Sequence, residues 1–150
     1  AWATLIGGIL FITVEYGLRG RPSRDQVSWV AALAIGAAQL LAAVFPGTSR
    51  SGATILLGLC LGVSRPVATE FSFLLGIPTL LAAGLVQGHS ALKDPTQHTD
   101  LAMLLLGSAV AATVAFAVVR WILGYVRKHD FVPFGLYRIA LGLGMLLFVH

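Results

Sequence analysis

Between two apolar stretches of this chain lies the segment that decides its fold, Pro46-Gly47-Thr48-Ser49-Arg50-Ser51-Gly52-Ala53-Thr54. Residues 27–45 before it form an Ala-rich apolar helix that carries Gln39, and residues 53–61 after it are apolar but too short to cross a bilayer. Proline disfavours helix at the preceding residue and glycine opens a turn, so the helix is expected to break at Pro46-Gly47. A break between a long and a short apolar arm predicts a re-entrant helix-loop-helix over residues 27–61.

Composition places the rest of the chain in the same environment. Of the 150 residues, 57% are hydrophobic and only 11% are charged, and the mean hydropathy is +0.89. A soluble domain is usually about a quarter charged. So few charges cannot cover a surface that faces water, and we therefore predict an all-α, polytopic membrane protein.

Four further apolar runs predict transmembrane helices at about residues 2–18, 66–87, 101–125 and 133–149. The net charge of +4 indicates loop orientation in such a protein, not a nucleic-acid partner. Basic residues gather in residues 19–24 and again at Arg127-Lys128, whereas residues 88–100 carry Lys93 against two aspartates. The positive-inside rule puts the first and last of these loops in the cytoplasm and the middle loop outside.

That orientation requires residues 27–64 to enter and leave the membrane on the same side. Two full spans would satisfy the requirement as well, but the short second arm favours re-entry. Irregular backbone at membrane depth is tolerated only where protein or water surrounds it, so the loop is expected to line a polar cavity. The chain opens inside an apolar run without an initiator methionine, and we expect it to begin partway through a longer protein whose N-terminal portion is missing.

The chemistry of the loop centres on Arg50. An arginine at the bilayer centre costs about 2.5–3.5 kcal/mol on insertion scales, and no acidic residue lies close in sequence to pair with it. The planar guanidinium pairs bidentately with phosphate oxygens. A bound phosphate would therefore make this arginine tolerable.

The neighbours of Arg50 fit the same ligand. Ser49, Ser51 and Thr54 each carry a hydroxyl donor, and Gly47 and Gly52 allow the backbone to approach a ligand closely. The helix expected to begin near Gly52 directs its free N–H groups and its positive dipole end at the loop. The alternative is a polar turn whose arginine snorkels to lipid headgroups and whose hydroxyls cap the next helix.

Several other polar residues have two interpretations each. Gln39 either points into the loop cavity or hydrogen-bonds to another helix. Glu70 suits the dipole at the start of the helix from residue 66, or lies near the site. Arg138 either snorkels or reaches a lipid phosphate. Glu15 and Tyr16, at the end of the first span, are expected to be interfacial anchors.

The nine-residue loop resembles, in full, the PGxSRSxxT signature of undecaprenyl-diphosphatases, the bacitracin-resistance type of membrane phosphatase. The stretches at residues 71–78 and 134–142 are similar to later helices of that family, and the resemblance extends from about Ile6 to the C-terminus. It implies hydrolysis of undecaprenyl diphosphate to the monophosphate, which regenerates the lipid carrier for cell-wall precursors, and an architecture of inverted repeats.

Carried over by position, the resemblance implies catalytic roles for Ser49 and Arg50 and contacts with the diphosphate substrate from Gly47, Thr48, Ser51, Gly52 and Thr54; from the residue pattern alone we add Gln39. The family's other motif, (E/Q)xxxE followed by serines and a histidine, is absent, and none of the four histidines matches it: His89, His98, His129 and His150. The general acid or base and the ligands of a divalent cation (Mg or Ca) are therefore expected in the missing portion, with no metal ligands here. The fragment alone is expected to hydrolyse nothing.

The implied setting is the bacterial inner membrane, with a polyprenyl diphosphate lipid as substrate and a homodimer among the assemblies allowed. A transporter or flippase for an anionic polyprenyl lipid is the alternative, because broken helices whose N-termini face an anion also build transporter sites.

Overall fold

The computed structural model describes residues 1–45, 47–93 and 101–148. Pro46 of the loop, residues 94–100 of the predicted outer loop with His98, and residues 149–150 with His150 lie outside the described residues. Within the described ranges the chain forms six helices, which confirms the all-α class. They are α1 (Trp2–Gly17), α2 (Trp29–Val44), α3 (Arg50–Cys60), α4 (Arg65–Lys93), α5 (Leu101–Val126) and α6 (Val132–Phe148).

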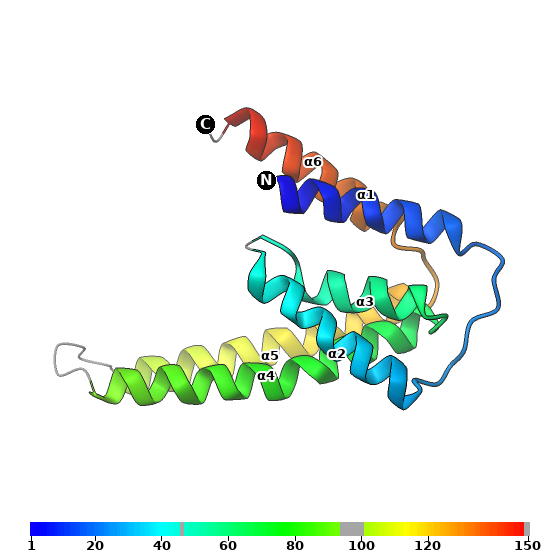
Figure 1. Cartoon of the computed structure of the whole chain (residues 1–150). Coiled ribbons are helices and arrows are strands. Elements are labelled where there is room, and N and C mark those ends of the chain that lie inside the picture. The colour runs from blue at the N-terminus through cyan, green and yellow to red at the C-terminus, as the bar shows by residue number, and fades with distance from the viewer. Residues whose placement is uncertain (46, 94–100, 149–150) are drawn as a thin grey trace.

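The helices are arranged as three pairs (Figure 1). Helix α1 packs along α6, α2 packs along α3, and α4 forms a long hairpin with α5. Helix α3 lies in the middle, because it also contacts α1 and α4. The polar loop between α2 and α3 is thereby placed beneath α1.

Two of the helices have the length and apolar composition to cross a membrane, in the segments Arg65–Ser90 and Ala102–Val126. The remaining apolar helices are shorter, so spans at 2–18 and 133–149 stay predictions. Helix α3 has 11 residues, and at about 1.5 Å per residue it covers roughly half of the ~30 Å hydrocarbon layer. The re-entrant pair at 27–61 and the inverted-repeat arrangement also stay predictions.

The connections between helices gather at one end of the molecule, which we call the basic end: residues 19–24, 62–65 and 126–130. The Arg24 N–H donates to the Gly62 carbonyl at 2.8 Å, and the Ser64 N–H donates to the Arg24 carbonyl at 2.9 Å. Arg19 pairs with Asp130 at 3.0 Å, joining the first and last connections. The opposite end, with the N-terminus of α1 and the connection between α2 and α3, is called the loop end (Figure 1).

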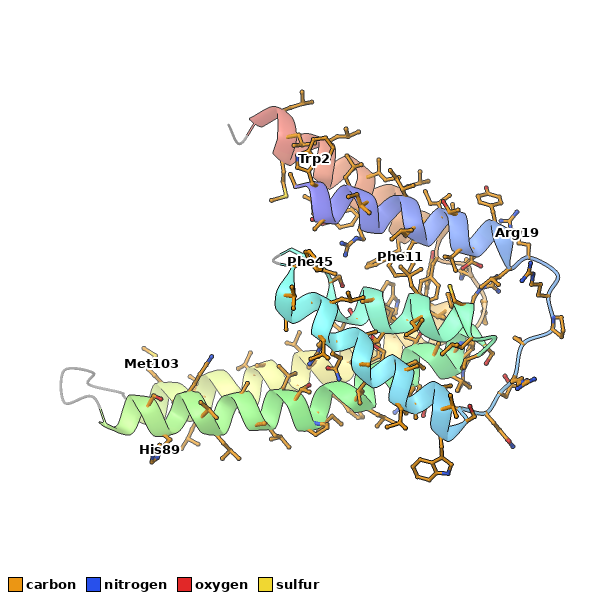
Figure 2. All side chains as sticks on the ribbon, in the orientation of Figure 1. Trp2, Phe11, Arg19, Phe45, His89 and Met103 are labelled. Carbon is orange, nitrogen blue, oxygen red and sulfur yellow. The ribbon has the colours of Figure 1, made fainter. Side chains whose placement is uncertain are left out.

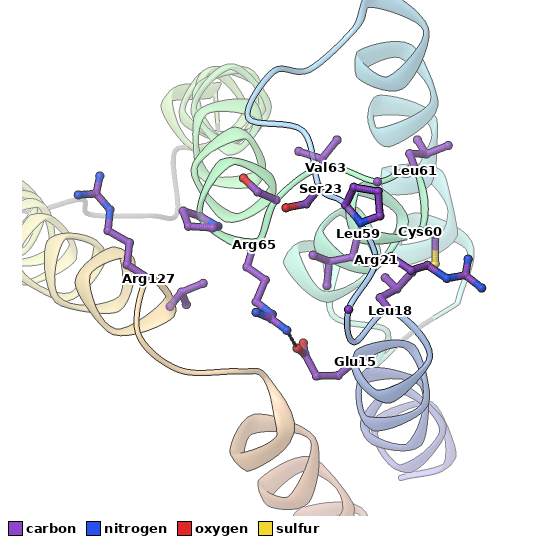
Figure 3. A pocket seen from close by; sticks show the side chains of 16 residues that line it. Glu15, Leu18, Arg21, Ser23, Leu59, Cys60, Leu61, Val63, Arg65 and Arg127 are labelled. Carbon is purple, nitrogen blue, oxygen red and sulfur yellow. Dashed lines mark ion pairs between the residues drawn. The ribbon is translucent and has the colours of Figure 1, made fainter.

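A buried ion pair closes the basic end. Glu15 of α1 is only 2% exposed and pairs with Arg65 at the start of α4, on the wall of a cavity of about 410 Å³ (Figure 3). The Phe131 N–H donates to the same carboxylate at 3.5 Å. The expectation that Glu15 is an interfacial anchor is therefore wrong, because its partners come from helices far away in sequence.

Glycines bring α1 and α6 into close contact. A Cβ added to Gly8 would lie 2.8 Å from the Gly135 carbonyl oxygen, and one added to Gly135 would lie 2.6 Å from Ile12 Cγ1. Such small residues allow membrane helices to approach closely. Phe11 lies beside this contact, with its ring centroid 5.4 Å from that of Phe134 and 5.6 Å from that of Phe131.

The α4–α5 hairpin contrasts with this core. Residues 102–118 of α5 are all exposed, and Figure 2 shows Met103 of α5 and His89 of α4 near the far end of the hairpin. His89 was expected in a loop, but α4 continues to Lys93. An exposed apolar surface of this kind suits a lipid environment.

Candidate functional site

The polar loop forms a turn and then caps α3. Gly47 has a φ of +86°, a left-handed conformation that favours glycine. The Ser49 hydroxyl oxygen then accepts the Gly52 N–H at 3.1 Å as the N-cap of α3. Because Ser49 captures the first turn, the helix begins at Arg50, two residues before the expected start near Gly52. A Cβ on Gly52 would lie 3.2 Å from Phe11 Cε2, so this glycine admits a ring of α1.

The hydroxyls of the loop separate into two groups. Ser49 Oγ and Ser51 Oγ lie 3.3 Å apart and are both half-buried. Thr54, predicted to contact substrate, is 2% exposed, and its hydroxyl lies 2.6 Å from that of Ser72 in α4. The two serines are therefore together at the start of α3, whereas the Thr54 hydroxyl is engaged between α3 and α4.

Arg50 is half-buried and directed at α4. Its Nη1 donates to Thr79 Oγ1 at 2.6 Å, and its Nη2 lies over Gly76, where an added Cβ would come within 2.8 Å. In the part of the chain that the structure describes, no carboxylate pairs with this guanidinium. The arginine is held by a neutral hydroxyl and keeps its full charge for an anion.

A second guanidinium approaches the loop from the other side. Arg138 of α6 is 9% exposed and lies over Gly7 of α1, where an added Cβ would be 2.9 Å from Nη2. It lines a cavity of about 230 Å³ together with Thr48, Ser49 and Gly52. Snorkelling, one of the two interpretations of Arg138, is therefore wrong for this chain. The similarity of residues 134–142 to a later helix of the family includes Arg138. Nothing in the sequence, however, pairs Arg138 with Gly7 of α1.

Gln39 does not line this cavity, although Ala38 and Leu41 from the same helix do. Its side chain is half-buried, and no hydrogen bond joins it to another helix within the described ranges. Glu70 lies exposed on the outer face of α4. The binding role of Gln39 stays a prediction, as do the individual roles of the loop residues.

The described residues include histidines and carboxylates, side chains that can bind a metal ion. Among residues 1–45, 47–93 and 101–148, no three His, Cys, Asp or Glu side chains come together to hold an ion. His129 lies in the connection after α5 and stacks on Tyr125 at 4.3 Å. The described residues therefore do not fit a divalent cation by themselves.

Comparison with known proteins supports the family resemblance that was based on the loop. The family model described as bacitracin resistance protein BacA matches residues 1–144. Undecaprenyl-diphosphatases from Xylella fastidiosa and Rhizobium etli are each 45% identical over 148 residues, covering 97% of this chain. The undecaprenyl-diphosphatase of Xanthomonas oryzae pv. oryzae is 44% identical over 155 residues, covering 99%.

These alignments cover 57% of the Xylella and Xanthomonas proteins and 56% of the Rhizobium protein, so the chain spans little more than half the length of its curated relatives. The match includes the loop, α3 and Arg138 in one continuous segment. The chain therefore belongs to the bacitracin resistance protein BacA family of membrane proteins, whose named relatives are undecaprenyl-diphosphatases.

Proposed function

We propose that this chain is the headgroup-binding portion of a bacterial inner-membrane phosphatase. The full-length protein hydrolyses undecaprenyl diphosphate to undecaprenyl phosphate and inorganic phosphate, and thereby recycles the cell-wall lipid carrier. The observation that carries the proposal is the position of Ser49 and Arg50 side by side in the chain at the start of α3, where Ser49 caps the helix and Arg50 has no carboxylate partner among the described residues. The names of the relatives support the same substrate.

The reaction adds water across the P–O–P bond. In the net reaction, the oxygen of water becomes bonded to the terminal phosphorus, and the bond between that phosphorus and the bridging oxygen breaks. The bridging oxygen leaves with the lipid phosphate, and the two protons of water pass to the phosphate products or to solvent. Charge accumulates on the phosphoryl oxygens and the leaving oxygen, so positioning and electrostatic stabilisation provide most of the catalysis.

Arg50 is the residue best placed to stabilise that charge. One arm of its fork is fixed by Thr79 at 2.6 Å, which leaves the remaining N–H donors for phosphate oxygens. The first N–H groups of a helix lack intrahelical partners, and the Ser49 oxygen satisfies only that of Gly52. The start of α3 therefore adds backbone donors and a positive dipole end to the guanidinium.

Ser49 can donate as well as accept. Its oxygen accepts the Gly52 N–H, and its hydroxyl proton stays free for a phosphate oxygen or for Ser51 Oγ, 3.3 Å away. Thr54 supports this arrangement through its bonds to the carbonyls of Arg50 and Ser51 at 3.1 and 3.0 Å. The divalent cation, Mg or Ca, and the general acid or base belong to the remainder of the full-length protein.

The experiment measures phosphate release from undecaprenyl diphosphate by the purified full-length protein in detergent micelles. Micelles have no second compartment, so a transporter without hydrolytic activity would release no phosphate. Release that depends on Arg50 supports the proposal, and a folded full-length protein that releases none would refute it. Residues 1–150 alone should release none, and activity from that fragment would show that this portion is self-sufficient.

A further inference from the structure

A buried guanidinium in α6 has no partner in the described part of the chain. Arg138 is 9% exposed, its Nε is fully enclosed without a hydrogen-bond partner, and neither ion pair of the described residues includes it. An arginine stays protonated in proteins. An unpaired buried charge is unfavourable, so a compensating anion is expected.

The surroundings of Arg138 show where that anion binds. The side chain crosses α1 over Gly7, where a Cβ would lie 2.9 Å from Nη2 and 3.3 Å from Nε. Beyond this glycine it lines the cavity of about 230 Å³ whose other wall carries Thr48, Ser49 and Gly52. The guanidinium and the start of α3 therefore face the same partly open cavity, whose remaining lining is mostly apolar.

We infer that Arg138 is a second anion-binding residue, which binds phosphate oxygens of a headgroup held at the start of α3. The inference rests on the proposed function and adds a residue to it. A diphosphate carries more negative charge than one guanidinium neutralises, and Arg50 approaches only from the side of α4. Arg138 binds from the side of α6, so the headgroup lies between two arginines from different helix pairs.

Gly7 acts as a positioning residue in this arrangement. A side chain at position 7 would occupy the space of the guanidinium. Gly17, on the same helix, has no atom within 4 Å of an added Cβ, so Gly17→Ala is a matched control for Gly7→Ala. Arg120 of α5 is exposed, so Arg120→Gln is a matched control for Arg138→Gln.

The test uses the full-length protein in detergent and isothermal titration with two non-hydrolysable probes. Methylenediphosphonate presents the headgroup alone, and its farnesyl ester presents the headgroup with an isoprenoid tail. Loss of a charge-assisted hydrogen bond should weaken binding of both probes about 10- to 100-fold in Arg138→Gln. Arg138→Lys should recover part of the loss, since it restores the charge but not the fork. Gly7→Ala should weaken both probes about 10-fold by displacing the guanidinium.

The outcomes separate clearly. Equal weakening of both probes, with both controls at the wild-type level, supports the inference. Wild-type binding by Arg138→Gln, or weakening confined to the farnesyl probe, overturns it. If Arg138→Gln does not give a folded protein, Gly7→Ala decides, and wild-type binding by that variant overturns the inference. A wild-type protein that binds both probes through Arg138 but releases no phosphate would refute the proposed function and leave the anion site standing.

Discussion

Arg50 is half-buried and Arg138 is buried, and each guanidinium lies over a glycine of a neighbouring helix, yet their partners differ. Arg50 lies over Gly76 and donates to Thr79, whereas Arg138 lies over Gly7 without a hydrogen-bond partner at Nε. The difference shows two ways in which this fold holds an arginine. A neutral hydroxyl orients Arg50 without neutralising its charge. Arg138 is held by the packing of its side chain over Gly7.

The largest effect is expected from Arg50→Ala in the full-length protein. Removing a guanidinium that stabilises phosphoryl charge should lower the rate of phosphate release about 10³-fold or more. Expression and the melting temperature should change little, because Arg50 has no ion-pair partner to strand among the described residues. Phosphate release and thermal unfolding would be measured on the same preparation. Wild-type turnover would remove Arg50 from the proposed site.

Arg50→Lys tests whether charge alone suffices. A lysine ammonium is a point charge that cannot bind two phosphate oxygens in parallel or donate to Thr79 at the same time. We expect turnover to fall about 10²-fold, a figure typical of losing one transition-state donor. The kinetic assay is the same as for the alanine variant. A lysine variant as active as the wild type would show that the fork geometry is unnecessary.

Gly76→Ala tests whether the close contact between Gly76 and the Arg50 guanidinium is needed for activity. The added methyl would lie 2.8 Å from Nη2, so the guanidinium must shift away from Thr79. We expect a loss of about 10-fold in kcat/KM, corresponding to one displaced hydrogen bond to a charged group. Gly84→Ala in the same helix meets no atom within 4 Å and is the control. Equal activities of the two variants would contradict the importance of this contact.

Thr79→Val should have the smallest effect. It removes the hydroxyl that accepts the Arg50 Nη1–H at 2.6 Å while preserving side-chain shape. We expect a loss of about 5-fold in kcat/KM, because a single hydrogen bond of about 1 kcal/mol is removed. The change should appear in kcat more than in KM if Thr79 orients the arginine for the transition state. An unchanged kcat would mean that the hydroxyl only fills space.

The local elements of this fold could be predicted from the sequence, because their signals are local. The Pro46-Gly47 break, the short second arm and the apolar runs predicted helices close to those observed. The start of α3 lies two residues before the expected position near Gly52, because Ser49 caps the helix, as the alternative interpretation of the loop hydroxyls allowed.

The contacts that build the site were not predictable in the same way. The contact of Arg50 with Thr79, the position of Arg138 over Gly7 and the Glu15–Arg65 pair each join helices distant in sequence. Their partners are a hydroxyl, a glycine and an arginine inside or beside apolar runs, where composition gives no pairing information. Packing of α1 on α6 and of α3 on α4 decides these contacts.

The contacts at the basic end have a consequence for the motion of α1 relative to the connection between α2 and α3. There the Glu15–Arg65 pair and the hydrogen bonds of Arg24 hold α1, α3 and α4 together, whereas within the described ranges no hydrogen bond or ion pair joins α1 to Thr48 or Ser49. The basic end is therefore expected to act as a hinge, about which α1 and the connection between α2 and α3 can move apart. Spin labels at Trp2 and Val44 should report a broad distance distribution that narrows with bound headgroup. A distribution as narrow as that between labels at Tyr16 and Leu61 would mean that the loop end does not open.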